Sequence, residues 1–153
     1  MAKKQNFQFT QEGFKNFKKE LRELETRRPQ TVINLSNARE QGDLSENAGY
    51  HAAKDELSQI DSRIREIKYL LRVGQVVEIA KTNHVTFGTK VTVHDGQYEM
   101  TFTIVEELEA NPTTGKISTD SPIGQALIGK KLGEEFEVLI PSGKIKLKVT
   151  KII

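Results

Sequence analysis

The hydrophobic residues of the first half of the chain recur every three or four positions, which is the spacing of one helix face. A first row of such residues consists of Phe14, Phe17, Leu21, Leu24, Val32, Leu35 and Ala38. A second row consists of Tyr50, Ala53, Leu57, Ile60, Ile64, Ile67 and Leu71. Two long helices joined by a short turn must run antiparallel. The pattern therefore predicts a coiled-coil hairpin whose two apolar rows meet in a seam.

Two features of the sequence predict where the first helix of this hairpin kinks and where it ends. Arg28 occupies a seam position and Pro29 follows it, so the helix should kink or break briefly there because proline lacks an amide donor. Helices often end at a glycine, so the first helix is predicted to end at Gly42. With roughly 25–30 residues on each side, we expect a finger about 40 Å long.

From Val76 onward the apolar period changes to two, which is typical of strands. Strands are predicted over 76–79, 90–93, 98–105, 117–118, 135–140 and 144–152. Pro122 begins a short helix that runs to residue 128, with Asp120 or Ser121 as its cap. The predicted fold class is α+β: a long antiparallel helical hairpin followed by a small α+β domain.

Composition supports this division. Of the 153 residues, 29% are charged and 36% hydrophobic, which an elongated and exposed part would explain. A net charge of +2 argues against a protein that binds polyanions by bulk charge. No run approaches the ~20 apolar residues of a membrane span, so we expect a cytoplasmic protein without membrane contact. The predicted parts are a finger over 1–75, with an acidic tip at 41–47, and a domain over 76–153.

Two carboxylates, Asp43 and Glu46, lie three residues apart in the predicted turn. One interpretation is a capping box, in which Asp43 caps the second helix and Glu46 bonds back. The other is that both help to hold Mg²⁺, which proteins usually bind through one or two carboxylates together with substrate phosphates and water. No third acid or histidine accompanies them, so a partner would have to supply the remaining ligands. The two interpretations are not exclusive.

Basic and aromatic residues flank the two acids. Arg39 and Lys54 can contact a phosphate backbone, or they can be solvated charges that offset Glu40 and Asp55. Tyr50 fits a seam position better than a platform for stacking bases.

Two stretches carry a family resemblance. The segment 38–54, AREQGDLSENAGYHAAK, closely resembles the tip motif of bacterial Gre transcript-cleavage factors of the GreA type. The segment 121–130, SPIGQALIGK, resembles their C-terminal motif, and the similarity extends over essentially the whole chain. The resemblance implies that the second domain is FKBP-like.

The resemblance also implies a function, that of an accessory elongation factor and not an enzyme in its own right. The hairpin would enter the secondary channel of bacterial RNA polymerase and rescue backtracked complexes. Asp43 and Glu46 would there help to hold a Mg²⁺ that is shared with the polymerase and not bound by the protein alone. The polymerase would then cleave the 3′ end of the nascent RNA. The factor would act as a monomer.

Further residue roles follow from the same resemblance. Positions expected to contact RNA or polymerase are Arg39, Ser45, Tyr50 and Lys54. The loop expected to dock on the channel rim holds Asp120, Ser121 and Pro122. Ser45 stands where many members have a cation, so RNA contact there should be weaker.

Two other functions compete with this one. A regulator can occupy the channel and dock without stimulating cleavage, because docking and cleavage use different residues. The FKBP-like domain suggests a prolyl isomerase as the second alternative. Such an enzyme needs an aromatic-lined pocket, whereas the C-terminal half of this chain has no Trp and few aromatic residues.

Overall fold

The computed structural model describes residues 7–79 and 81–153, and the chain divides into two units. The first unit contains Phe7 and Glu12–Gly74, and the second contains Gln8–Gln11 together with Gln75–Ile153. The expected boundary at 75/76 lies one residue from this division. Residues 8–11 were predicted to belong to the finger, but the structure places them in the second unit.

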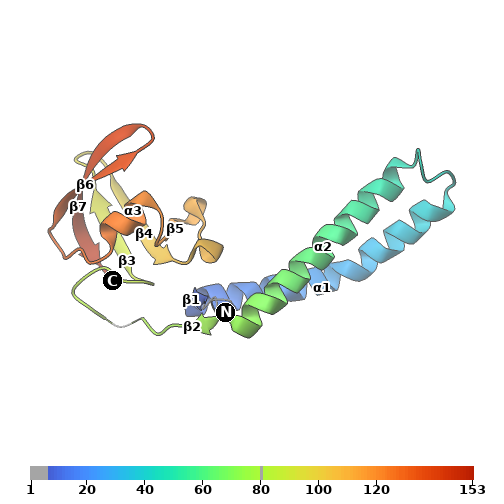
Figure 1. Ribbon diagram of the computed structural model, residues 1–153, viewed down its shortest axis with the longest axis horizontal. Coiled ribbons are helices and arrows are strands. Elements are labelled where there is room, and N and C mark those ends of the chain that lie inside the picture. Colours follow the sequence, from blue (N-terminus) through green and yellow to red (C-terminus); the bar gives the residue numbers. More distant parts are fainter. Residues whose placement is uncertain (1–6, 80) are drawn as a thin grey trace, which may run out of the picture. The chain divides into compact units, whose positions relative to one another are not determined.

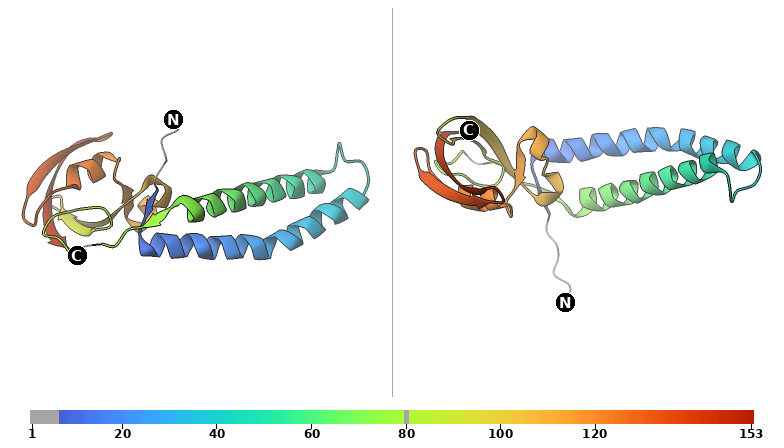
Figure 2. Two further views of the ribbon diagram at one scale, coloured as in Figure 1. Left: turned by 60° about the horizontal axis from the view of Figure 1, so that its bottom comes forward. Right: turned by 90° about the horizontal axis from the view of Figure 1, so that it is seen from above.

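The first unit is a helical hairpin made of α1 (Gln11–Glu40) and α2 (Ala48–Val73), which lie side by side in Figures 1 and 2. At about 1.5 Å per residue, α1 is about 45 Å long. The predicted seam is confirmed at Phe17, Ala38, Ala53, Ile60, Ile64 and Ile67, which are buried. At its end the prediction was wrong by one residue, because Leu70 is buried and Leu71 is only half-buried. No helix among the described residues is long and apolar enough to cross a membrane.

The prediction was wrong in detail around Pro29. α1 continues through this residue without a break, although its ribbon changes direction along its length in Figure 2. Thr31 is 2% exposed whereas Val32 is 38% exposed, so the seam resumes one residue earlier than predicted. Because the helix is not interrupted, the seven-residue spacing from Phe17 through Leu24 to Thr31 and Ala38 is preserved.

Arg28 does not enter the seam but reaches across to α2. Its guanidinium donates to both carboxylate oxygens of Asp61, at 2.6 and 3.2 Å, and holds the pKa of Asp61 below its usual value. Further pairs between the two helices are Arg27–Glu56, Glu20–Arg63 and Glu25–Lys68. Charges that flank an apolar seam in this way select the register of the two helices.

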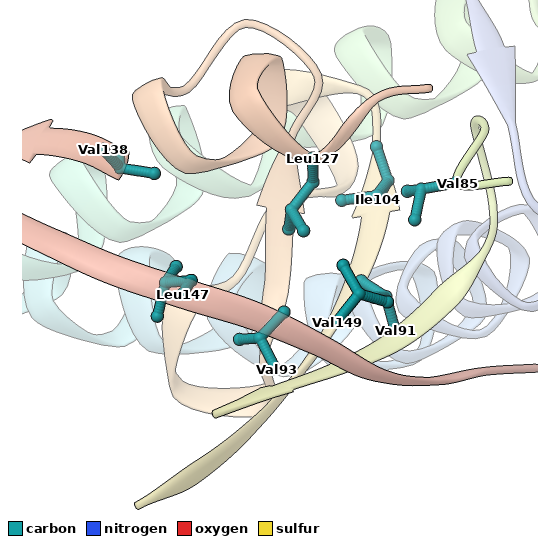
Figure 3. Close-up of a cluster of buried hydrophobic side chains, with 8 residues drawn as sticks. All are labelled: Val85, Val91, Val93, Ile104, Leu127, Val138, Leu147 and Val149. Atoms are coloured by element: carbon teal, nitrogen blue, oxygen red, sulfur yellow. The ribbon is translucent and has the colours of Figure 1, made fainter. Parts of the chain in front are cut away.

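The second unit contains a five-stranded sheet with the order β5-β4-β3-β7-β6. Its strands are β3 (Lys90–His94), β4 (Glu99–Val105), β5 (Lys116–Ser118), β6 (Glu135–Ile140) and β7 (Gly143–Ile152). Neighbouring strands are antiparallel except β4 and β5, which are parallel. The helix α3 (Pro122–Leu127) adds Leu127 to the buried cluster of Figure 3. The α+β prediction is confirmed.

A short strand that the sequence pattern did not predict also belongs to this unit. β1 (Gln8–Phe9) pairs in parallel with β2 (Gln75–Val76). A strand was predicted over 76–79, but β2 ends at Val76, three residues before the end of that range. Thr10 follows β1 and donates its amide, at 3.1 Å, and its hydroxyl to the buried carboxylate of Glu109. Glu109 ends the short 3-10 helix η1 (Glu107–Glu109), and a second one, η2 (Pro112–Thr114), follows.

Candidate functional site: an acidic turn and a serine-capped loop

The turn between α1 and α2 spans residues 41–47 and contains both predicted acids. The chain leaves α1 through Gly42, whose φ of +127° is costly for residues with a side chain. The cap of α2 is Asn47, whose side-chain oxygen accepts the Tyr50 amide at 3.0 Å. The capping-box interpretation of Asp43 is therefore wrong, because Asp43 lies four residues before the true cap. An asparagine directly before an apolar helical pattern was the signal that would have identified this cap.

Asp43 organises the turn locally. Its Oδ1 atom accepts the backbone amide of Ser45 at 3.0 Å and the Ser45 hydroxyl at 2.8 Å. These two bonds lower the pKa of Asp43, the backbone bond having the larger effect. Among the described residues, neither its Oδ2 atom nor the exposed Glu46 carboxylate receives a hydrogen bond. The turn thus presents carboxylate oxygens that are open to an external ligand.

Replacing Ser45 by alanine is expected to raise the pKa of Asp43 toward its ordinary value, because one of the two hydrogen bonds to Oδ1 disappears. A depressed carboxyl pKa stabilises the fold above the unfolded-state pKa, and this contribution is lost as pH falls through the folded-state pKa. In Ser45→Ala this contribution should be smaller, and it should be fully lost at a higher pH than in wild type. Carboxyl ¹³C NMR titration measures this shift, and an unchanged Asp43 curve would contradict the assignment of the hydroxyl bond.

The flanking residues gather on the two helix ends next to the turn. The Arg39 guanidinium lies 5.8 Å from the centre of the Tyr50 ring, and the His51 ring meets Tyr50 edge-on at 5.4 Å. Tyr50 is half-buried by these neighbours, in agreement with a packing position. Lys54 is exposed and forms no ion pair with any residue that the structure describes, so it is available to a phosphate but also fits a solvated charge.

The residues 118–124 of the second unit run from the end of β5 into the first turn of α3 and contain Asp120, Ser121 and Pro122. We call this segment loop 118–124. Ser121 is the cap of α3: its hydroxyl accepts the Gly124 amide at 3.0 Å and donates to the Ser118 carbonyl at 2.7 Å. Of the two residues predicted as possible caps of this helix, Ser121 is therefore the cap and Asp120 is not. Asp120 and Pro122 remain exposed, with Pro122 at the first helical position.

An apolar hollow of about 600 Å³ borders this loop, through Thr119 on one side of it and Gln125 on the other. Its other lining residues are His84, Val85, Thr86, Phe87, Ile128 and Gly129. Phe87 and the imidazole of His84 are the aromatic groups of this lining, which does not favour an isomerase pocket.

The exposed Asp120 also acts on a neighbouring carboxyl group of the same unit. The pKa of Glu106 is raised, mainly by burial of its side chain and secondly by the negative charge of Asp120.

The donor set of the acidic turn fits a shared Mg²⁺ and not a complete site. Mg²⁺ takes six oxygen ligands in nearly ideal octahedral geometry and usually keeps several waters. Asp43 and Glu46 supply the carboxylate portion, and no three acidic or histidine side chains of the described residues gather closely enough to hold a metal ion. Any further ligands would have to come from another molecule.

Comparison with known proteins supplies the class of protein. The family model described as "Transcription elongation factor, N-terminal" matches residues 7–76, and "Transcription elongation factor, GreA/GreB, C-term" matches residues 79–153. These matches define a transcription elongation factor built of a helical hairpin and an α+β domain. The chain belongs to the GreA/GreB family, whose factors act on RNA polymerase during elongation.

Two relatives with curated names agree with this assignment. The chain is 42% identical to the transcription elongation factor GreA of Listeria welshimeri, with 99% of this chain and 98% of that protein covered. It is 43% identical to GreA of Caldanaerobacter subterraneus, with 94% of each covered. Among solved structures, GreA factor homolog 1 (Gfh1) of Thermus thermophilus is 26% identical with a TM-score of 0.46, covering 97% of this chain and 99% of that one.

Proposed function

We propose that this protein rescues backtracked bacterial RNA polymerase by inserting the acidic turn into the secondary channel and stimulating cleavage of the nascent RNA 3′ end. The observation that carries the proposal is the pair of exposed carboxylates on the turn, which keep oxygen atoms free of internal hydrogen bonds. Such a pair at the end of a hairpin about 45 Å long can reach into a narrow channel.

The chemical role of the two acids is to complete a site that lies mainly on the polymerase. Asp43 and Glu46 would help to hold a second Mg²⁺ there, which would supply a lowered pKa for the attacking water and offset charge on the scissile phosphate. Asp43 contributes a ligand through Oδ2, because Oδ1 is engaged by Ser45. Glu46 orients the water for attack on phosphorus, with the 3′ oxygen as leaving group. The depressed pKa of Asp43 keeps its carboxylate ionised for this purpose.

The cationic and aromatic residues beside the turn fit a nucleic-acid partner. Arg39 and Lys54 are exposed on the two helices next to the acids and can contact RNA phosphates. The ring of Tyr50 is already covered in part by Arg39 and His51, so it supports the Arg39 side chain and does not stack on bases. The Ser45 hydroxyl is engaged by Asp43, which leaves it little capacity for RNA.

We further propose that loop 118–124 docks on the polymerase. Asp120 and Pro122 are exposed on either side of Ser121, whose hydroxyl bonds to the backbone of this segment, and an apolar hollow lies directly beside it. A buried apolar contact flanked by a few exposed polar groups is the usual anatomy of a protein interface.

The alternative is a regulator that docks in the channel without stimulating cleavage. The test uses a bacterial polymerase stalled on 5′-labelled RNA with a backtracked 3′ end. Adding the factor should shorten the RNA and restore elongation in the presence of Mg²⁺. Binding in a competition assay without shortening would instead support the alternative, and absence of both would overturn the two proposals together.

A further inference from the structure

We propose that Asn47 is a positioning residue whose side chain closes the neck of the acidic turn and holds Asp43 and Glu46 in one arrangement. The neck is the hydrogen bond between the Asn47 Nδ2 atom and the Ala38 carbonyl oxygen, at 2.6 Å. This inference rests on the proposed function, since it assigns a role to a residue that supports the two acids.

Asn47 bonds to both helices at once. Its Nδ2 atom donates to Ala38 near the end of α1, while its Oδ1 atom accepts the Tyr50 amide in the first turn of α2 at 3.0 Å. A carbonyl can only accept and an amide N–H can only donate, so these partners fix the orientation of the carboxamide. Aspartate has no donor when ionised, and serine has one short hydroxyl, so neither can reproduce both bonds.

The packing at the neck is close enough for this single side chain to span it. Ala38 is buried, and a Cβ built on Gly49 would lie 3.9 Å from the Ala38 Cβ. The Ala38 carbonyl also accepts the Gln41 amide at 3.2 Å, which closes the last turn of α1. The same carbonyl therefore joins the end of one helix to the start of the other.

The two acids lie inside the loop that this neck closes. Glu46 directly precedes Asn47, so its backbone is held by the capped start of α2. Asp43 is bound to Ser45, which lies two residues before Asn47. Opening the neck would release residues 41–46 into many conformations. A displacement of about 1 Å in reacting groups can reduce a rate by about a hundredfold.

The test is Asn47→Asp in the full-length protein. Aspartate keeps the cap for Tyr50 and suits a helix N-terminus, so thermal stability should change little. It places an oxygen against the Ala38 carbonyl, so the neck should open. We expect the ¹⁵N order parameters of Ser45 and Glu46 to fall below about 0.6. The maximal rate of RNA cleavage should fall about ten- to a hundredfold, whereas the factor concentration for half-maximal cleavage should not change.

Two further variants separate the neck from charge and from capping. Asn47→Ser keeps a cap acceptor without adding charge and should behave like Asn47→Asp. Asn37→Asp adds the same charge at an exposed position of α1 and should resemble wild type. If Asn47→Asp and Asn47→Ser both keep an ordered turn or the wild-type maximal rate, Asn47 is only a helix cap and the inference is wrong. If wild type itself stimulates no cleavage, the proposed function fails, and the order parameters still decide whether Asn47 closes the neck.

Discussion

Asp43→Asn is expected to remove most of the stimulated RNA cleavage while leaving the fold intact. The asparagine Oδ1 atom can still accept both Ser45 donors, so the turn should keep its conformation. The charge and the basicity of Oδ2 are lost, and with them a Mg²⁺ ligand. Changes in groups that merely support metal ligands cost about 10–100-fold in activity, so loss of a ligand should cost on the order of a hundredfold or more.

The measurement is the maximal cleavage rate at saturating factor, together with thermal unfolding and polymerase affinity. Asp55→Asn is the matched control, because it makes the same chemical change at an exposed position of α2 outside the turn. Its cleavage rate should equal that of wild type. Wild-type cleavage by Asp43→Asn would show that the carboxylate is not a ligand and that its hydrogen bonds to Ser45 are its whole role.

Gly124→Ala is expected to disrupt loop 118–124. A Cβ at this position would lie 2.0 Å from the Ser118 carbonyl oxygen and 2.8 Å from the Ser121 hydroxyl. The first of these atoms belongs to the backbone, so the loop must move. Overpacking costs about 1–3 kcal/mol, and loss of the Ser121 cap adds about 1 kcal/mol. Asp120 and Pro122 would then leave the positions from which we propose that they dock.

Gly124→Ala should therefore lower thermal stability and raise the factor concentration needed for half-maximal cleavage, with little change in the maximal rate. A Gly124→Ala protein with wild-type stability and affinity would contradict both the loop geometry and its proposed role. Asp43→Asn and Gly124→Ala are thus expected to change different kinetic quantities.

The hairpin was largely predictable because its stability depends on a repeating local pattern. A seven-residue apolar repeat specifies which face is buried whatever the partner, and the buried residues of α2 follow it from Ala53 to Ile67. The error at Pro29 arose because a local rule about proline was applied without its context. The seam and the Arg28–Asp61 pair hold α1 together across that residue.

The acidic turn was predictable in its residues but not in its geometry. Asp43 and Glu46 have the spacing of a capping box, and that spacing alone does not tell where the helix begins. Asn47 begins it because its carboxamide can satisfy both Tyr50 and Ala38, and the second partner is nine residues away in the sequence. Sequence reasoning therefore named the acids and missed the residue that holds them.

The sequence by itself determined the two-part architecture, the seam, the strands of the sheet and the family to which the chain belongs. Each of these is encoded in local periodicity or in a continuous motif. Only the tertiary structure decided that Gln8–Phe9 pairs with β2 and that Asn47 bridges the two helices. It also decided that the buried Glu109 carboxylate accepts a hydrogen bond from Thr10. Such contacts depend on groups that meet in space after folding, and a short strand or a lone polar residue carries no periodic signal.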